Sequence, residues 1–484
     1  MAPIKLAIIG AGPSAFYVAS RLLSLLPVGS SSKLNIHLYD RLWAPHGLVR
    51  YGVAPDHPEN CTHKFDTAAE DPRLRFFGNV NIATQSPVPH ALSLPLSSLL
   101  PHYTHLLISS GCTTPILHPA IPPSDYCVPA LSLVHWYTQH PSRPSPPPLQ
   151  QLQHITLIGQ GNVSLDIARM LLTPPSELAK FDVPAHVLAV LERSAVEHVS
   201  IVGRRGLQQA AFTTKELREM MNLTDASMVP LDPALLKEPD AGGEPLTRQQ
   251  ARTLQLLQKG SKNKPGTTRK TWSLEFFRSP LLLDLPTGAA QESSGVRPPA
   301  QLTLAHTMLD ASARAVPTGE KSTQSTSLVV TSLGHRAEPS APWYEPSLGH
   351  INTVGGRVVD PSGLTVRNVY ASGWAATGAR GVLASTMMDA YAVANTILRD
   401  AFPGEDVQTT PTEVLPRTVE DDAPPPEIEA ALKEGQVLEY ADWKVINAEE
   451  IRRGEKIGKE QEEHNLHITP YASASNLNPQ LNRV

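Results

Sequence analysis

The sequence predicts an α/β protein with two doubly wound domains, the second inserted into the first. An apolar strand, a glycine turn and an amphipathic helix occur in that order twice, at residues 7–23 and 157–175. A second strand follows each unit, ending at Asp40 in one and at Arg205 in the other. The stretch NVYASGW (368–374) and an apolar helix from about 381 to 401 suit the end of a sheet begun earlier. We therefore expect an outer domain of residues 1–113 and 335–484 and an inserted domain of residues 114–334.

Composition excludes several classes of protein. The 484 residues carry 41 Lys and Arg against 46 Asp and Glu, a mildly acidic balance that does not favour nucleic-acid binding. Cys61, Cys112 and Cys127 form no C-x-x-C pair, so no redox dithiol or metal site is predicted. No apolar run approaches the length of a membrane span, and no presequence is visible before the first strand. We expect a soluble chain that handles electrons by other means than sulfur.

Both glycine turns have the residues that a dinucleotide pyrophosphate requires. Gly10 and Gly159 allow the tight bend, while Gly12 and Gly161 let the backbone approach the phosphates. Ala15 and Ser164 are small enough for close packing of helix on strand, and the helix N-terminus then attracts the phosphates. One such motif is weak evidence, but two in strand–turn–helix context predict two Rossmann-like domains.

The residues after the second strands predict two different ligands. A carboxylate accepts a hydrogen bond from a free ribose 2′-hydroxyl and repels a 2′-phosphate, whereas arginine does the reverse. Asp40 therefore suits FAD, and Arg204 with Arg205 suits NADPH. The separation between Gly159 and Arg204 exceeds the usual spacing of about 20 residues, which we attribute to an extra helix and loop in TPPSELAKFDVPAH (173–186).

Longer stretches of the chain resemble one family. They are GLVRYGVAPDHPE (47–59), FFGNV (76–80), IGQGNVSLDIARMLLTPP (158–175), VGRRG (202–206), AFTTKELREM (211–220), FFRSP (276–280), ASGW (371–374) and the segment from Asp442 to Lys459. In order, and over nearly the whole chain, they resemble the mitochondrial adrenodoxin reductases, flavoproteins that take hydride from NADPH onto FAD and pass single electrons to a [2Fe-2S] ferredoxin. The proline-rich loops and insertions point to a fungal member.

The resemblance implies the cofactor contacts. For FAD they are Ser14, Asp40, Leu48, Ile82, Trp374, Gly381, Val382 and Leu383. For NADP they are Gln160, Gly161, Asn162, Val163, Arg204, Arg205, Glu216 and Gly381. Three departures stand out: AATGARG (375–381) lacks a basic pair and a Gly-Pro, Ser14 replaces the usual alanine, and residues 57–65 are about two residues short.

Three residues are candidates for the active site itself. Asp56 and His57 in APDHPE would line the flavin and tune it or relay a proton, although a histidine hydrogen-bonded in a turn before Pro58 is an equal alternative. Trp374 would form a wall of the flavin site, with a core tryptophan as the alternative.

The charge distribution suggests where an acidic ferredoxin would dock. Residues 248–270 contain seven Lys and Arg and no acidic residue, namely Arg248, Arg252, Lys259, Lys262, Lys264, Arg269 and Lys270. Arg218, in the KELRE segment, is the first choice for a direct contact, and a solvated loop is the alternative for 248–270.

The resemblance to the family implies a location in the mitochondrial matrix, with at most peripheral association with the inner membrane.

The sequence also leaves alternative functions open. They are a flavin monooxygenase or diaphorase, an amidotransferase-type reductase, whose cysteine-rich segment is absent, and a catalytically silent NADP-binding protein.

Overall fold

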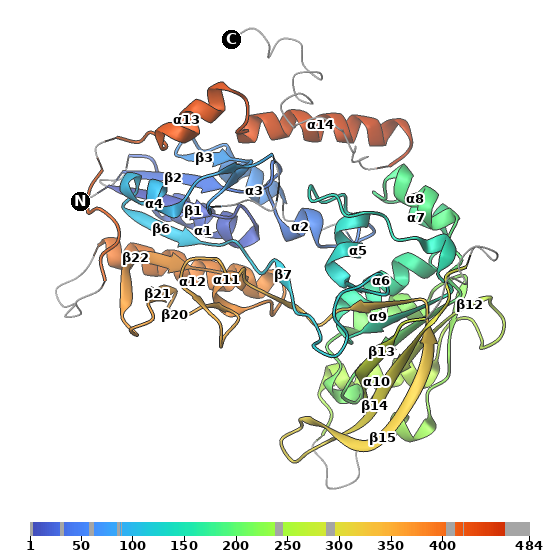
Figure 1. Ribbon diagram of the computed structural model, residues 1–484. Helices are drawn as coiled ribbons and strands as arrows, with labels where there is room; N and C mark the ends of the chain where they lie inside the picture. Colours follow the sequence, from blue (N-terminus) through green and yellow to red (C-terminus); the bar gives the residue numbers. More distant parts are fainter. Residues whose placement is uncertain are drawn as a thin grey trace. The chain divides into compact units, whose positions relative to one another are not determined.

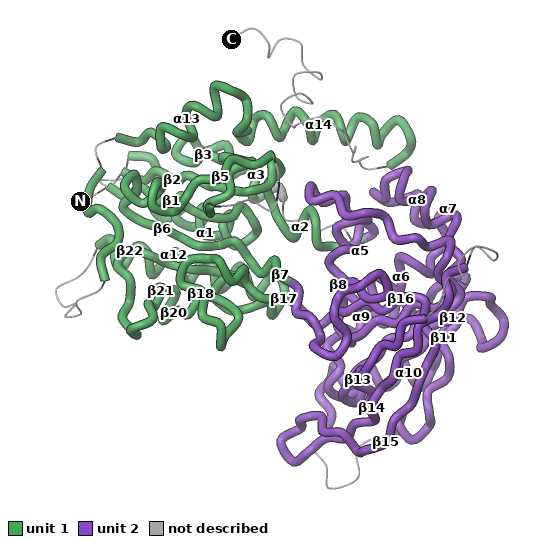
Figure 2. Tube along the Cα trace, viewed as in Figure 1, with its two compact units in different colours: residues 1–53, 57–114, 335–484 green, residues 54–56, 115–334 purple. Residues whose placement is uncertain are grey.

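The chain folds into two compact units. A computed structural model describes residues 3–29, 33–57, 62–84, 88, 90–237, 245–286, 296–402, 412–419 and 421–459. The first unit contains residues 1–53, 57–114 and 335–484, and the second contains residues 54–56 and 115–334 (Figure 2). The second unit is therefore an insertion in the first, as the repeated strand–turn–helix pattern predicts.

The first unit is built on a seven-stranded sheet (Figure 1). Its order is β20 (Thr353–Val354), β21 (Arg357–Val359), β22 (Thr365–Ala371), β6 (His105–Ile108), β1 (Ile4–Ile9), β2 (Leu34–Tyr39) and β3 (Leu74–Phe77). β22 runs parallel to β6, with Val369 opposite Leu106, although 256 residues separate the two strands along the chain from Ile108 to Thr365. The tail of the chain thus completes the sheet that the first residues begin, as predicted.

Helices cover both faces of this sheet. α1 (Pro13–Leu25), α3 (Thr62–Ala69) and α12 (Leu383–Ala401) share one core with β1, β2 and β3. α4 (Leu96–Leu99), α11 (Trp374–Thr377) and α13 (Pro426–Lys433) contribute to the core on the opposite face. α14 (Tyr440–Lys456) contacts β3, the last strand of the sheet. The C-terminal ends of β1 and β2 lead into the first glycine turn and Asp40.

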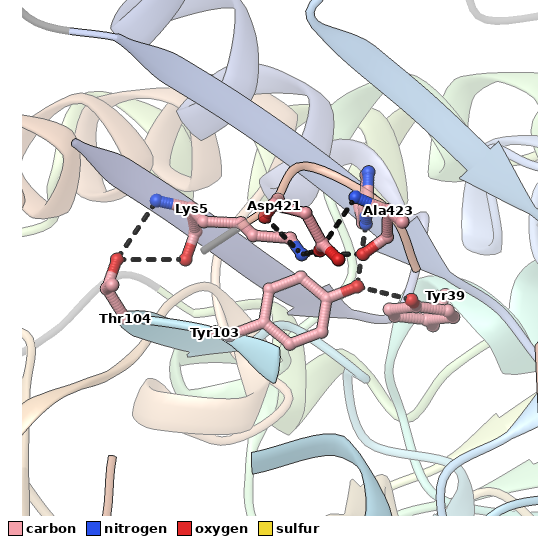
Figure 3. Close-up of polar contacts among 7 residues, drawn as sticks. Lys5, Tyr39, Tyr103, Thr104, Asp421 and Ala423 are labelled. Carbon is pink, nitrogen blue, oxygen red and sulfur yellow. Dashed lines mark hydrogen bonds and ion pairs between the residues drawn. The ribbon is translucent and has the colours of Figure 1, made fainter. Parts of the chain in front are cut away.

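A buried lysine of β1 forms hydrogen bonds to the backbone of residues 421–423. Lys5 is 2% exposed, and its Nζ donates to the carbonyl oxygens of Asp421 (3.0 Å) and Ala423 (2.5 Å), as Figure 3 shows. The ammonium also lies 5.1 Å from the centre of the Tyr103 ring. Burial lowers the pKa of Lys5, and Asp421 opposes that shift. Lys5 therefore holds the start of the segment that leads to α13 and α14.

The second unit has a parallel sheet of six strands. Its order is β11 (Ala226–Met228), β12 (Lys270–Glu275), β10 (His198–Val202), β9 (His154–Ile158), β16 (Leu328–Thr331) and β8 (Cys127–Pro129). One face carries α5 (Ala130–Tyr137), α6 (Asn162–Leu172), α8 (Ala185–Glu192) and α9 (Thr214–Met221). On the other face, Leu302 and Leu304 pack on Ile158 and Val329. They belong to an antiparallel sheet of β13 (Arg278–Asp284), β14 (Ala300–Leu309) and β15 (Ala315–Thr326).

Candidate functional site

The first glycine turn leaves room for a ligand where the sequence predicts it. Gly10 has φ +96°, and a Cβ atom there would lie 2.6 Å from the carbonyl oxygen of Ser109, so only glycine fits. A Cβ atom on Gly12 would meet nothing within 4 Å. Since α1 begins directly after Gly12, its free backbone N–H groups face this open space. The turn therefore fits a pyrophosphate.

Asp40 lies beside this turn at the end of β2. Its Oδ2 accepts from the backbone N–H of Ala11 (2.7 Å), and its Oδ1 accepts from the N–H of Leu42 (2.8 Å). Burial raises the pKa of Asp40, while these two hydrogen bonds lower it. Each carboxylate oxygen retains a lone pair, so Asp40 can accept hydrogen bonds from ribose hydroxyls.

The turn between β22 and α12 is joined to the start of α1 by a buried polar chain. The Ser14 hydroxyl lies 2.6 Å from that of Ser372, which donates to Asp389 Oδ2 (3.0 Å). The same carboxylate oxygen accepts from the N–H of Gly373 (2.7 Å). The serine at position 14 therefore bonds to protein rather than leaving its hydroxyl free for a ligand. No sequence pattern indicates Asp389, because its pairing with Ser372 and Gly373 exists only once α12 packs on β22.

The other predicted FAD contacts differ in their exposure. Leu48 is 44% exposed at the start of α2 (Leu48–Tyr51), and Val382 is 63% exposed just before α12. Such exposure is what a flavin would cover. Trp374 is half-buried, and its indole N–H donates to the carbonyl oxygen of Arg380 (2.9 Å). Ile82 packs against the core, Gly381 has φ +83°, and Leu383 begins α12.

The second glycine turn repeats this arrangement in the second unit. Gly159 has φ +128°, and a Cβ atom there would collide with the carbonyl oxygen of Ser332, whereas Gly161 faces open space. Asn162 begins α6, and its Oδ1 accepts from the N–H of Thr213 (2.8 Å). The Thr213 hydroxyl in turn donates to Glu216. The N-termini of α6 and α9 are thereby brought together, and this turn also fits a pyrophosphate.

Two further predicted NADP contacts, Gln160 and Val163, lie in this turn and in the helix that follows it. Gln160 donates through its amide to the carbonyl oxygens of Ile201 (3.4 Å) and Glu275 (3.3 Å), and Val163 lies in the first turn of α6. Gly381 belongs to the first unit, whereas every other predicted NADP contact belongs to the second.

Arg204 and Arg205 follow the end of β10, next to the strand that carries the second turn. Both are exposed, and neither guanidinium has an ion pair with a carboxylate among the residues that the structure describes. Two unpaired guanidinium groups at this edge suit a 2′-phosphate. The long separation from Gly159 is explained by α7 (Pro175–Leu178) and α8, which lie between α6 and β10, so the predicted extra helical segment is confirmed.

Asp56 and His57 belong to different units. Asp56 forms an ion pair with Arg169 of α6, and Arg169 also contacts Asp166 (2.8 Å) and Glu219 (3.6 Å). His57 is half-buried in the first unit, directly before residues 58–61, which lie outside the described residues. Of the segment 57–65, which the sequence suggests is about two residues short, only His57 and the residues from Thr62 onward are described. The motif LDIAR contains Arg169 and Asp166, but spacing alone does not pair them with Asp56.

The basic run divides into two parts. Arg248, Arg252 and Lys259 lie exposed on α10 (Arg248–Lys259), followed by exposed Lys262 and Lys264. Arg269 instead pairs with Glu197 (3.3 Å). Lys270 is half-buried, donates to the carbonyl oxygens of Leu171 (3.3 Å) and Leu172 (3.4 Å), and has a pKa lowered by burial. Among the described residues of this run, the exposed charges without a carboxylate partner therefore end at Lys264, and Arg218 is exposed on the neighbouring α9.

Within the described residues, no group of three or more His, Cys, Asp or Glu could hold a metal ion. None of their helices has both the length and the apolar character of a membrane span.

Comparison with known proteins gives the family. A scan against protein-family models finds no match. The mitochondrial NADPH:adrenodoxin oxidoreductase of Bos taurus is 34% identical over 480 residues, covering 95% of this chain and 89% of that protein. NADPH-ferredoxin reductase FprA of Mycobacterium tuberculosis is 32% identical over 472 residues, covering 95% of this chain and 96% of that protein. The solved structure of FprA in complex with NADPH has a TM-score of 0.80 at 30% identity, covering 98% of this chain and 99% of that one. The chain belongs to the NADPH:adrenodoxin oxidoreductase family.

Proposed function

We propose that the protein is an FAD-dependent NADPH:ferredoxin oxidoreductase. The observation that carries this is the pair of glycine turns with opposite ribose-reading side chains, Asp40 beside one and exposed Arg204 and Arg205 beside the other. Bound FAD would supply the conversion between the two-electron donor NADPH and a one-electron iron–sulfur carrier. The chain's own residues bind and orient the two dinucleotides.

Residues 1–113 and 335–484 form the proposed FAD domain. Gly10 and Gly12 admit the pyrophosphate, and Asp40 accepts from the adenosine ribose. The side chain of Trp374 forms a wall of the flavin site. The remaining contacts to FAD are Ser14, Leu48, Ile82, Gly381, Val382 and Leu383, with Ser14 acting through its backbone because its hydroxyl bonds to Ser372.

Residues 114–334 form the proposed NADP domain. The N-termini of α6 and α9 face the phosphates and the ribose, and Arg204 and Arg205 select the 2′-phosphate. The remaining contacts are Gln160, Gly161, Asn162, Val163 and Glu216, together with Gly381 from the other domain. Gly381 has an exposed backbone at φ +83°, which lets a ligand approach closely.

Asp56 and His57 are proposed to act near the reacting atoms. Arg169, whose side chain is buried, pairs directly with Asp56 and fixes the position of its carboxylate. His57 would then hold or move a proton beside the flavin. This assignment rests on the resemblance of APDHPE to the family motif.

The electron acceptor is proposed to be a mitochondrial [2Fe-2S] ferredoxin. Arg218 and the exposed charges from Arg248 to Lys264 supply a positive surface for an acidic partner, and its binding should weaken with salt. We place the enzyme on the matrix side of the inner membrane, because the Bos taurus relative is named mitochondrial. The proline-rich loops favour a fungal member.

NADPH-dependent cytochrome c reduction tests the function, after the visible spectrum of the purified protein has been recorded. Bound flavin and activity that requires added mitochondrial [2Fe-2S] ferredoxin are the expected results. Bound flavin with the same rate in the absence of ferredoxin would favour a diaphorase or monooxygenase. A colourless protein that still binds NADPH would favour a silent binding protein.

A further inference from the structure

Residues 46–52 consist of two loop residues, the short helix α2 and Gly52, and are termed here the 46–52 loop. This segment touches the first glycine turn through its backbone. The N–H of His46 donates to the carbonyl oxygen of Ala11 (2.8 Å). A Cβ atom on Gly47 would lie 3.3 Å from the Cα atom of Gly12, so the two backbones are in contact. Ala11 also donates its own N–H to Asp40. The turn is thereby held on one side by Asp40 and on the other side by the 46–52 loop.

His46 adopts a backbone conformation that needs support. Its φ is +81°, in the left-handed region that is unfavourable for a residue with a side chain. The side chain is 2% exposed, with its ring 4.9 Å from that of Trp443 and 5.3 Å from that of Phe16. Burial lowers the pKa of His46 to about 3, so the imidazole is neutral. Neighbouring side chains must therefore hold this strained corner in place.

Helix α14 supplies this support at both ends of the loop. The Tyr440 hydroxyl donates to Asp66 Oδ1 (2.6 Å) and lies 3.2 Å from Nε2 of His46. Since the single hydroxyl proton goes to the carboxylate, Nε2 of His46 is the donor to Tyr440. At the other end, Arg50 donates to Glu450 Oε2 (2.8 Å), and these two side chains are 8% and 7% exposed. One helix thus fixes both the first residues of the loop and its last turn.

We infer that α14 positions the FAD turn: through His46–Tyr440 and Arg50–Glu450 it holds the 46–52 loop against Ala11 and Gly12, and so sets the affinity for the flavin dinucleotide. His46, Arg50, Tyr440 and Glu450 are positioning residues in this scheme and do not contact the reacting atoms. The inference rests on the proposed function, since it requires FAD at the first turn. It gives the C-terminal helix a role in cofactor retention, although α14 carries no predicted FAD contact.

The test is the dissociation constant for FAD, measured by quenching of flavin fluorescence on adding FAD to the apoprotein. Tyr440→Phe keeps the ring and removes the hydroxyl. A net hydrogen bond of about 1 kcal/mol corresponds to about fivefold weaker binding of FAD. Glu450→Gln removes the buried carboxylate to which Arg50 donates and should weaken binding of FAD by about tenfold or more. Because Glu450→Gln can prevent folding, Tyr440→Phe is the deciding variant.

Two control variants separate positioning from general stability. Arg452→Gln removes an exposed charge from the same helix and should leave FAD affinity unchanged. Ile428→Val removes a methylene from a fully buried side chain of α13, so it should lower the melting temperature but leave FAD affinity unchanged. With FAD in excess, Tyr440→Phe should regain the wild-type kcat and KM for NADPH, which general unfolding would not allow.

Three results would overturn the inference. Wild-type FAD affinity in Tyr440→Phe would exclude it while leaving the proposed function intact. Equal losses of affinity in Tyr440→Phe and Ile428→Val, at equal losses of melting temperature, would reduce α14 to a stabilising element. A wild-type protein that binds no FAD would overturn the proposed function and this inference together.

Discussion

Replacing Arg204 and Arg205 by alanine should lower the preference of the enzyme for NADPH over NADH. The two side chains differ from most others near the site, because they are exposed and have no carboxylate partner among the described residues. Their removal therefore breaks no internal ion pair and should leave folding unchanged. Any loss of activity then reports on the ligand alone.

The size of the effect follows from the number of charged contacts. A hydrogen bond to a charged group contributes about 1.5–3 kcal/mol, and exposed side chains belong at the lower end of that range. Two such contacts give about 3 kcal/mol, which corresponds to roughly a 150-fold change. The specificity constant kcat/KM for NADPH should fall by about that factor in the double variant. The value for NADH, which lacks the phosphate, should change by less than about threefold, since these contacts are absent for it.

The assay is reduction of cytochrome c through added ferredoxin, with NADPH and NADH compared at several concentrations. Arg193→Ala is the matched control, because Arg193 is an exposed arginine of the same unit that donates to the carbonyl oxygen of Ala189. It should leave both constants unchanged. Equal losses for NADPH and NADH in the double variant would refute the assignment of the 2′-phosphate to these arginines, and so would no loss at all.

Other substitutions and pH test the remaining assignments. Trp374→Ala should weaken FAD retention by about tenfold, seen as free flavin after gel filtration, because a half-buried aromatic wall is removed; full retention would make Trp374 a core residue. His57→Gln should slow flavin reduction by NADPH in stopped flow, and an unchanged rate and flavin potential would end the proton-relay hypothesis. Arg218→Glu should raise KM for ferredoxin severalfold but not KM for NADPH, and equal effects on both would remove Arg218 from the docking surface. Stability should fall as pH drops below about 6.5, the ordinary pKa of histidine, because burial lowers the pKa of three histidines of the first unit to about 3 or 4, so that the unfolded chain alone takes up their protons. The three are His37 (pKa about 3), His46 (about 3) and His105 (about 4). Each of these histidines should lower the free energy of unfolding by about 1.4 kcal/mol per pH unit. A melting temperature that stays constant from about pH 7.5 to about pH 5.5 would contradict this prediction.

Local sequence is informative wherever a feature depends on neighbours along the chain. The glycine turns are readable because a tight bend, an open backbone and a close helix each need a small residue at a fixed place. Gly10 at φ +96° and Gly159 at φ +128° have the positive φ that this predicts. Residues 273–280 show where local pattern is not enough. Phe277 has φ +55° there, so β12 ends before it and β13 turns away to start a separate antiparallel sheet.

The candidate site was predicted less completely than the fold. Ser14 and Trp374 could be named from motifs, but their partners could not. The Asp389 carboxylate reaches Ser372 and Gly373 only because α12 packs back on β22, and no spacing in the sequence indicates this pairing. Lys270 has the charge that a docking surface needs, yet it donates to the carbonyl oxygens that end α6. Charge along a chain does not reveal which side chains a fold turns inward.

By itself, the sequence determined the two dinucleotide turns, the opposite chemistry of Asp40 and the arginine pair, and the return of the tail to the first sheet. These follow from steric limits and charge within short segments or from repetition of one pattern. Tertiary structure alone decided that Asp56 pairs with Arg169 and that His46 and Arg50 are held by α14. Those contacts join residues more than one hundred positions apart, and chain geometry brings such residues together only after the sheets have formed, so no local rule contains them.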